Sequence, residues 1–130
     1  MRIGGNDRPP RFPCLLFDDD GWLIPCESED DVQLAVEPDF LYDIEAAFDS
    51  RGCPLVLTVR DDEWIVPRVA GPPEPDDLAV GVRGFFRAWT DAPAPDLSGG
   101  VEQWVPEVIR LVRTTATRRR RREPNDPAGR

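Results

Sequence analysis

The sequence predicts an α+β domain in which an antiparallel sheet of about five strands has two to three helices packed on one face. Apolar and polar residues alternate over residues 44–69, as they do in strands with one buried face. Two later segments, 78–89 and 101–112, space their apolar residues as amphipathic helices do. With 130 residues, 40% of them hydrophobic, the chain can bury one modest core, so we expect a single domain.

The first elements are a hairpin and a short helix. Phe12–Phe17 is an apolar run, and Trp22–Pro25 returns after a turn at residues 18–21 whose glycine can adopt positive φ. A helix is expected to begin at Ser28, because its hydroxyl can accept from free N–H groups of the first turn. Pro38 ends that helix soon afterwards.

The middle of the chain predicts a three-stranded meander. Its expected strands are Ile44–Phe48, Leu55–Val59 and Trp64–Val69, with tight turns at 49–52 and 61–63. Pro54 and Pro67 have no amide donor, which predicts that they lie at strand ends or on a sheet edge.

The two later helices each carry one apolar stripe. The first stripe is Leu78, Val82, Phe85, Phe86 and Trp89, and the second is Val101, Trp104, Val105, Val108, Ile109 and Val112. Gly81 and Gly84 weaken the first helix by roughly 1 kcal/mol each, but they would permit close packing on the sheet. Pro106 either starts a helix near Val105 or lies inside a longer one from Gly100, and the unbroken periodicity favours the longer helix.

Charge is strongly segregated along the chain. Residues 1–116 carry 23 Asp and Glu against 10 Arg, whereas residues 117–130 carry six Arg against two acids. We therefore expect a flexible leader at 1–10, a single α+β domain at 11–116 and a disordered arginine-rich tail at 117–130. The acidic body disfavours phosphate binding, so nucleic-acid contact through Arg118–Arg122 is considered but not favoured.

The composition disfavours catalysis. The chain has no His and no Lys, which excludes Ser–His and Cys–His nucleophiles, Schiff-base lysines and phosphate-loop lysines. Paired carboxylates could still act as acid and base, but 25 acidic residues make any single pair uninformative. We expect no enzyme activity, no cofactor and no metal.

The three cysteines, Cys14, Cys26 and Cys53, form no metal-binding pattern. Cys14 and Cys26 could meet across the first hairpin. The odd number of cysteines in the chain favours free, buried thiols in the reducing cytoplasm. The apolar runs are too short to cross a membrane, so no membrane partner is expected.

Two acidic turns, each followed by a tryptophan, are the candidate partner-binding residues. They are Asp18, Asp19 and Asp20 with Trp22, and Asp61, Asp62 and Glu63 with Trp64. Carboxylates pair with arginine and aromatic rings anchor interfaces. The alternatives are that both tryptophans are core residues beside solvated turns, or that the first aspartate run binds a divalent cation.

Two stretches carry a family resemblance, FDDDGWLIPCESEDDVQLAVEPDF and AAFDSRGCPLVLTV, which lie within residues 17–60. They resemble small acidic actinobacterial immunity proteins, the partners of secreted polymorphic toxins. The resemblance implies stoichiometric occlusion of a basic toxin and assigns no catalytic residue.

The sequence therefore predicts a non-catalytic acidic binding protein, an immunity or inhibitor protein that occludes a basic protein partner. The alternative is a regulatory or scaffolding module whose arginine-rich tail contacts nucleic acid or a larger assembly.

Overall fold

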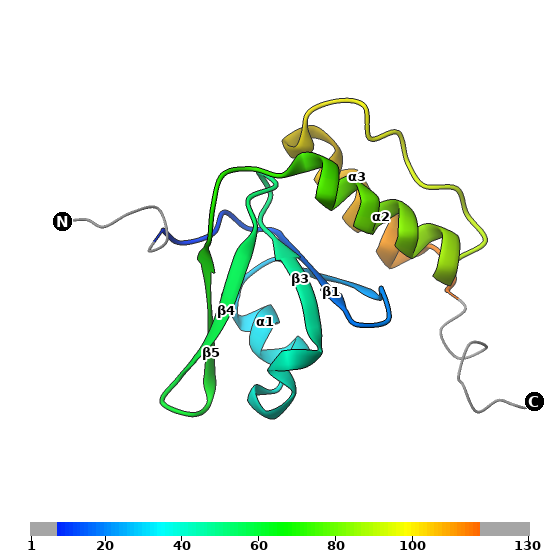
Figure 1. Ribbon diagram of the computed structural model, residues 1–130. Coiled ribbons are helices and arrows are strands. Elements are labelled where there is room, and N and C mark those ends of the chain that lie inside the picture. Colours follow the sequence, from blue (N-terminus) through cyan, green and yellow to red (C-terminus); the bar gives the residue numbers. More distant parts are fainter. Residues whose placement is uncertain (1–7, 118–130) are drawn as a thin grey trace, which may run out of the picture.

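The computed structural model describes residues 8–117, and it has the predicted α+β class (Figure 1). The strands are β1 (Cys14–Asp18), β2 (Leu23–Cys26), β3 (Ile44–Phe48), β4 (Leu55–Arg60) and β5 (Trp64–Val69). The helices are α1 (Glu29–Ala35), the 3₁₀ helix η2 (Pro38–Asp43), α2 (Pro75–Trp89) and α3 (Val101–Thr114). The 3₁₀ helix had no counterpart among the sequence predictions. None of the described helices is long and apolar enough to cross a membrane.

The expected single sheet of five strands is wrong, since the strands form two antiparallel sheets. One has the order β2-β1-β3 and the other is the hairpin β4-β5. The expectation that helices cover one face is also wrong. β1 is apolar on both of its faces, and a strand of that kind is stable only where both faces are buried. It lies at the centre of its sheet, with α2 and α3 against one face and α1 and β5 against the other.

The meander is confirmed only for its second hairpin. β4 pairs with β5 over their whole length, whereas β3 takes β1 as its partner. A single bridge between Phe48 and Pro54 joins β3 to β4. Pro54 has no N–H with which to extend that pairing, and the two strands diverge beyond it (Figure 1).

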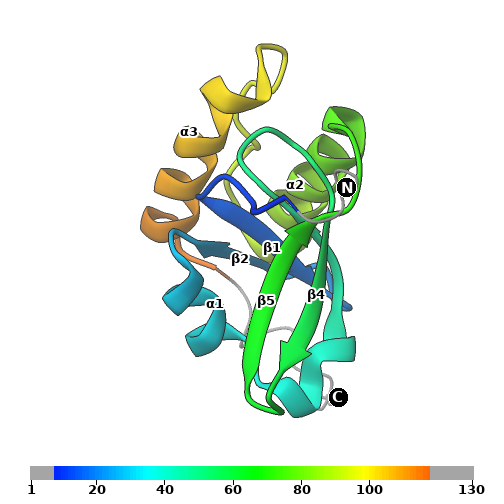
Figure 2. The same cartoon turned by 90° about the vertical axis from the view of Figure 1, so that its left-hand side faces the viewer.

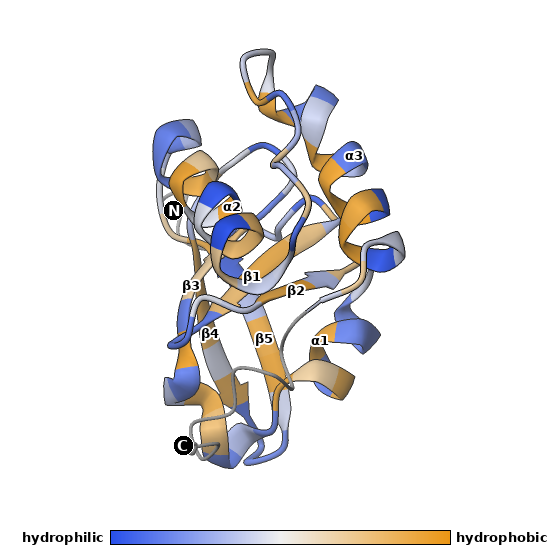
Figure 3. Cartoon of the chain, turned by 90° about the vertical axis from the view of Figure 1, so that its right-hand side faces the viewer, coloured by the Kyte–Doolittle hydropathy of each residue, from blue (hydrophilic) through white to orange (hydrophobic). Residues whose placement is uncertain are grey.

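Two hydrophobic clusters lie on opposite faces of the three-stranded sheet. Both predicted helix stripes pack into the larger one, where Phe85, Phe86 and Trp104 are buried. The smaller one joins Leu16, Val32 and Ile65. Figure 3 shows apolar residues gathered where the helices face the strands, with polar residues on their outer sides.

The predicted helix signals hold in detail. The Ser28 hydroxyl accepts from the N–H of Asp31 at 3.2 Å, at the start of α1. Pro106 lies inside α3, which begins after Gly100, so the longer of the two predicted helices is correct. Its exposed position leaves the missing hydrogen bond on the solvent side.

The two ends of the described chain are held by the backbone of the domain. The N–H of Val69 in β5 donates to the Arg8 carbonyl at 2.9 Å. Arg8, which belongs to the expected flexible leader, therefore lies beside β5. An isolated bridge joins Thr117 to Thr90 at the end of α2. The rest of the expected leader, 1–7, and the arginine run 118–122 lie outside the described residues.

The packing of α2 on β1 generates a test with a matched control. A Cβ added at Gly81 would lie 2.9 Å from Cζ of Phe17, whereas one at Gly84 meets no atom within 4 Å. We predict that Gly81→Ala lowers the free energy of unfolding by about 1–3 kcal/mol. Gly84→Ala should raise it by about 0.5–1 kcal/mol. Urea denaturation of both variants checks this, and a change of the same sign in both would contradict the packing described.

Candidate functional site: an acid-rimmed cleft

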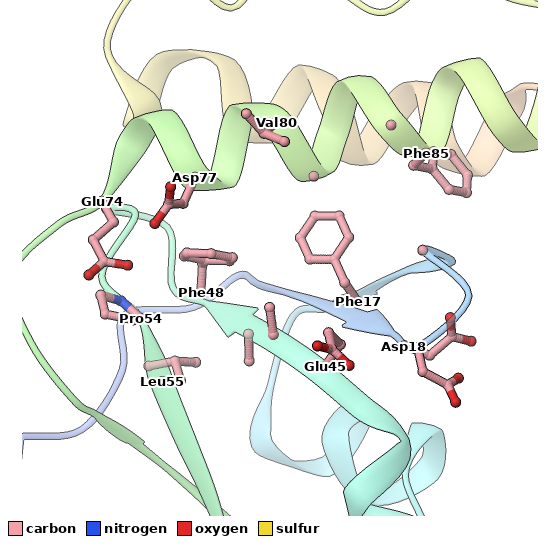
Figure 4. A pocket seen from close by; sticks show the side chains of 16 residues that line it. Phe17, Asp18, Glu45, Phe48, Pro54, Leu55, Glu74, Asp77, Val80 and Phe85 are labelled. Carbon is pink, nitrogen blue, oxygen red and sulfur yellow. The ribbon is translucent and has the colours of Figure 1, made fainter.

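A cleft of about 840 Å³ opens between α2 and the strands β3 and β4 (Figure 4). Its apolar wall is made by aromatic and aliphatic side chains, namely Phe17, Ala46, Phe48, Leu55, Val80 and Phe85. Val80 lies at the outer rim of the cleft on α2 and is 64% exposed (Figure 4). The cleft is therefore an apolar surface that the domain itself leaves open.

Two glycines of α2 make this cleft possible. Gly81 allows the helix to approach the ring of Phe17, and Gly84 adds open space beside it. Together with Asp77 and Val80 they form a stripe at i, i+3, i+4 and i+7, which turns one face of α2 toward the cleft.

Five carboxylates line the cleft, and no arginine of residues 8–117 does. Glu74 and Asp77 lie at the end next to Pro54, whereas Asp18 and Glu45 lie at the opposite end, with Asp19 completing the set (Figure 4). All except Asp18 are exposed. Like charges around one low-dielectric wall reinforce one another, so the cleft attracts cationic groups.

The first predicted acidic turn lies at one end of this cleft. Asp18 accepts at Oδ1 from the N–H groups of Asp20 and Trp22, at 2.9 Å each, and thereby fixes the turn. Asp18 and Asp19 line the cleft itself, whereas Asp20 is exposed beside it. Trp22 is half-buried against Phe85 and Trp89, at ring separations of 5.4 Å.

The same three aspartates form the one described acidic group compact enough for a cation, with a ligand atom of each within 4.8 Å of the others. The backbone hydrogen bonds to Asp18 account for this arrangement as a tight turn. We assign no metal to it.

The second predicted acidic turn lies elsewhere, at the tip of the β4–β5 hairpin (Figure 1). Asp61 and Asp62 have positive φ, of 57° and 65°, and the Glu63 N–H closes the turn on the Arg60 carbonyl at 3.2 Å. Trp64 is half-buried and donates through Nε1 to Glu29 at 3.3 Å. The two predicted patches therefore do not form one surface.

Sequence reasoning missed the other cleft residues, Glu45, Glu74 and Asp77. Glu45 is the residue of β3 without a register partner on β1, because the register shifts there. A signal for α2 was present in the sequence, since an acid, a valine and two glycines share a helix face beside the buried stripe. A helix face of this composition predicts a side of α2 that is neither buried in the core nor exposed only to water.

The turn that joins β3 to β4 is built around a buried carboxylate. Asp49 is fully buried and accepts from the N–H groups of Arg11, Arg51 and Cys53, at 2.9–3.1 Å. The Arg51 guanidinium adds a salt bridge of 2.7 Å. Burial alone raises the pKa of Asp49, but the hydrogen bonds from Arg51 and from the backbone outweigh it and hold that pKa below its usual value.

The cysteines add no reactive group to the site. Cys14 and Cys26 are register partners of β1 and β2, as the hairpin predicts, and all three cysteines are buried free thiols. Burial raises the pKa of Cys26 to about 12 and that of Cys14 still further, so the nucleophilic thiolate is suppressed.

Comparison with known proteins gives a fold and no family. No protein-family model and no curated protein matches the chain. Among solved structures, the NMR structure of a protein from Shewanella amazonensis is similar, with 21% sequence identity and a TM-score of 0.51. The likeness covers 89% of this chain and 100% of that one. At this identity it supports the shared fold alone.

The Asp49 turn generates a pH-dependent prediction. Because its pKa is lowered in the folded state, Asp49 stabilises the fold above about pH 4, the pKa range of an unfolded aspartate, and this contribution is lost as pH falls through the folded pKa. Asp49→Asn should lower the free energy of unfolding by about 2 kcal/mol or more at pH 7. The difference from wild type should shrink below about pH 4.

Denaturation at several pH values measures that difference. The control is Asp96→Asn, at an exposed turn where Asp96 accepts from Ser98 N–H, and there we expect little change. A difference between wild type and Asp49→Asn that stays constant down to pH 2 would contradict the assigned role of the charge.

Proposed function

We propose that this chain is a non-catalytic acidic protein that binds and occludes a basic polypeptide partner through the cleft between α2 and β3. The observation that carries the proposal is an apolar wall with five carboxylates around it and no lining arginine among the described residues. Apolar area supplies affinity once water is excluded, and the carboxylates select a cationic partner. The first acidic turn extends the same site through Asp18 and Asp19.

Net charge favours fast association with such a partner. The whole chain carries −9, and residues 1–116 are more acidic still, because they hold 23 of the 25 acids but only ten of the 16 Arg. An acidic body steers a basic protein toward it from a distance, with a rate that falls as salt rises. This combination suits an immunity or inhibitor protein that must cover a basic active site before the site acts. Three buried free thiols are consistent with a reducing cytoplasm as the place of action.

The arginine run supports a second candidate, a scaffold whose tail docks on nucleic acid or on a larger assembly. Replacing Arg118–Arg122 by glutamine separates the two proposals while the body stays unchanged. The scaffold proposal expects partner capture to be lost, and the occlusion proposal expects it to persist.

The central test is partner capture with two variants of equal charge change. The cleft variant is Glu45→Gln, Glu74→Gln and Asp77→Asn, and its control is Asp61→Asn, Asp62→Asn and Glu63→Gln at the hairpin tip. Both remove three negative charges, so they differ only in where the charge is lost. We expect wild type and the control to capture one basic protein stoichiometrically from the native cells at low salt. The cleft variant should capture much less.

Association kinetics with the captured partner then give the magnitude. We expect the cleft variant to slow association roughly threefold to tenfold more than the hairpin control at low salt. Equal effects of the two variants would show that net charge alone matters and would reject the cleft as the site. A larger effect of the hairpin variant would move the site to Asp61, Asp62 and Glu63. Circular dichroism and urea denaturation verify that all proteins compared are folded.

A further inference from the structure

The cleft also exposes an unpaired strand edge. β3 is an edge strand, and beyond the Phe48–Pro54 bridge no strand in the described chain pairs with its outer side. The N–H of Asp49 points across the turn to the Cys53 carbonyl at 3.0 Å. Because backbone groups alternate in direction along a strand, Ala47 faces the same side: the bridge engages its C=O, and its N–H points toward the gap between β3 and β4.

The fold protects the outer edges of β5 and β2 and leaves the facing edges of β3 and β4 open. Along β5, the side-chain amide of Gln33 accepts from the Ile65 N–H at 2.8 Å and donates to its carbonyl at 2.7 Å. Pro67, which has no N–H, comes next on the same outer side of β5, and after it the Val69 N–H donates to the Arg8 carbonyl. The edge strand β2 carries Pro25. Proline and covering groups are the usual protection of sheet edges, and neither β3 nor β4 contains a proline.

The gap between β3 and β4 opens into hollows toward both hydrophobic clusters. The acidic cleft lies on the α2 side, and a smaller hollow of about 230 Å³ lies on the side of Leu41 and Leu57. Both hollows are lined by residues 45–47 and by Leu55. An extended chain lying in this gap would direct alternate side chains to the two hollows, because successive side chains of a strand point to opposite faces.

We propose that the partner's segment binds as an added β-strand on the outer edge of β3, an inference that rests on the proposed function. The occupant is an extended segment with apolar residues at its centre and arginine or lysine at both ends. Apolar residues match Phe17, Phe48 and Val80, and the basic ends match the carboxylates at the two ends of the cleft. Main-chain hydrogen bonds to β3 supply sequence-independent affinity, and the two hollows supply selectivity.

The test uses the full chain and two synthetic peptides of identical charge. The probe is the acetylated, amidated peptide Arg-Arg-Val-Val-Val-Arg-Arg, and its control carries N-methyl groups on the three valines. N-methylation removes the donors that pair with a strand and leaves the charges unchanged. We expect the probe to bind and the methylated control to bind on the order of tenfold or more weakly in calorimetry. Hydrogen exchange should slow at residues 45–47 only with the probe.

Equal binding of the two peptides would overturn strand addition and leave occlusion by the cleft standing, since that depends on side-chain contacts with the apolar wall and the carboxylates and not on main-chain donors. Binding of the probe without slowed exchange at residues 45–47 would also overturn it. Failure of both peptides to bind would reject an extended basic segment as the occupant. The captured partner and the paired charge variants still test the proposed function independently.

Discussion

Asp49 carries a buried carboxylate that five hydrogen bonds hold at the point where β3 ends and β4 begins. A buried charge without these partners would be costly, so the chain around it must adopt the conformation that supplies them. Arg11 brings in the segment before β1, and Cys53 brings in the start of β4. This constraint fixes the turn from which the two strands diverge, and the cleft lies within that divergence.

The core and the cleft follow from one another. β1 needs apolar cover on both faces, and the domain meets this need by placing α2 and α3 on one face and α1 with the β4–β5 hairpin on the other. In Figure 2 that hairpin runs across the three-stranded sheet instead of extending it. The hairpin is thereby drawn away from β3, and the space left beside α2 becomes an apolar, acid-rimmed surface. The site is thus a consequence of how the helices and the β4–β5 hairpin cover opposite faces of one central strand, β1.

Local signals in the sequence predicted most of the elements. Ser28 marked the start of α1, and the two apolar stripes marked α2 and α3. Gly21 has positive φ, as predicted, with a value of 81°. Strand partners could not be predicted in this way, because pairing depends on which faces need cover across the whole domain. The alternation of β3 is equally compatible with β1 and β4 as neighbours, and the choice between them also decided where the cleft lies. Local reasoning therefore named Asp18 and Asp19 as candidates before their place in the cleft was known, whereas Glu74 and Asp77 became candidates only from the tertiary structure.

The acidic cleft is the proposed binding site of the basic partner. The most direct measurement is amide hydrogen exchange by mass spectrometry on the full chain, alone and in the purified complex with its captured partner. Binding in the cleft predicts slower exchange in β3 and in the first half of α2, with no change at residues 61–64. Slower exchange confined to residues 61–64, with β3 and α2 unaffected, would contradict it.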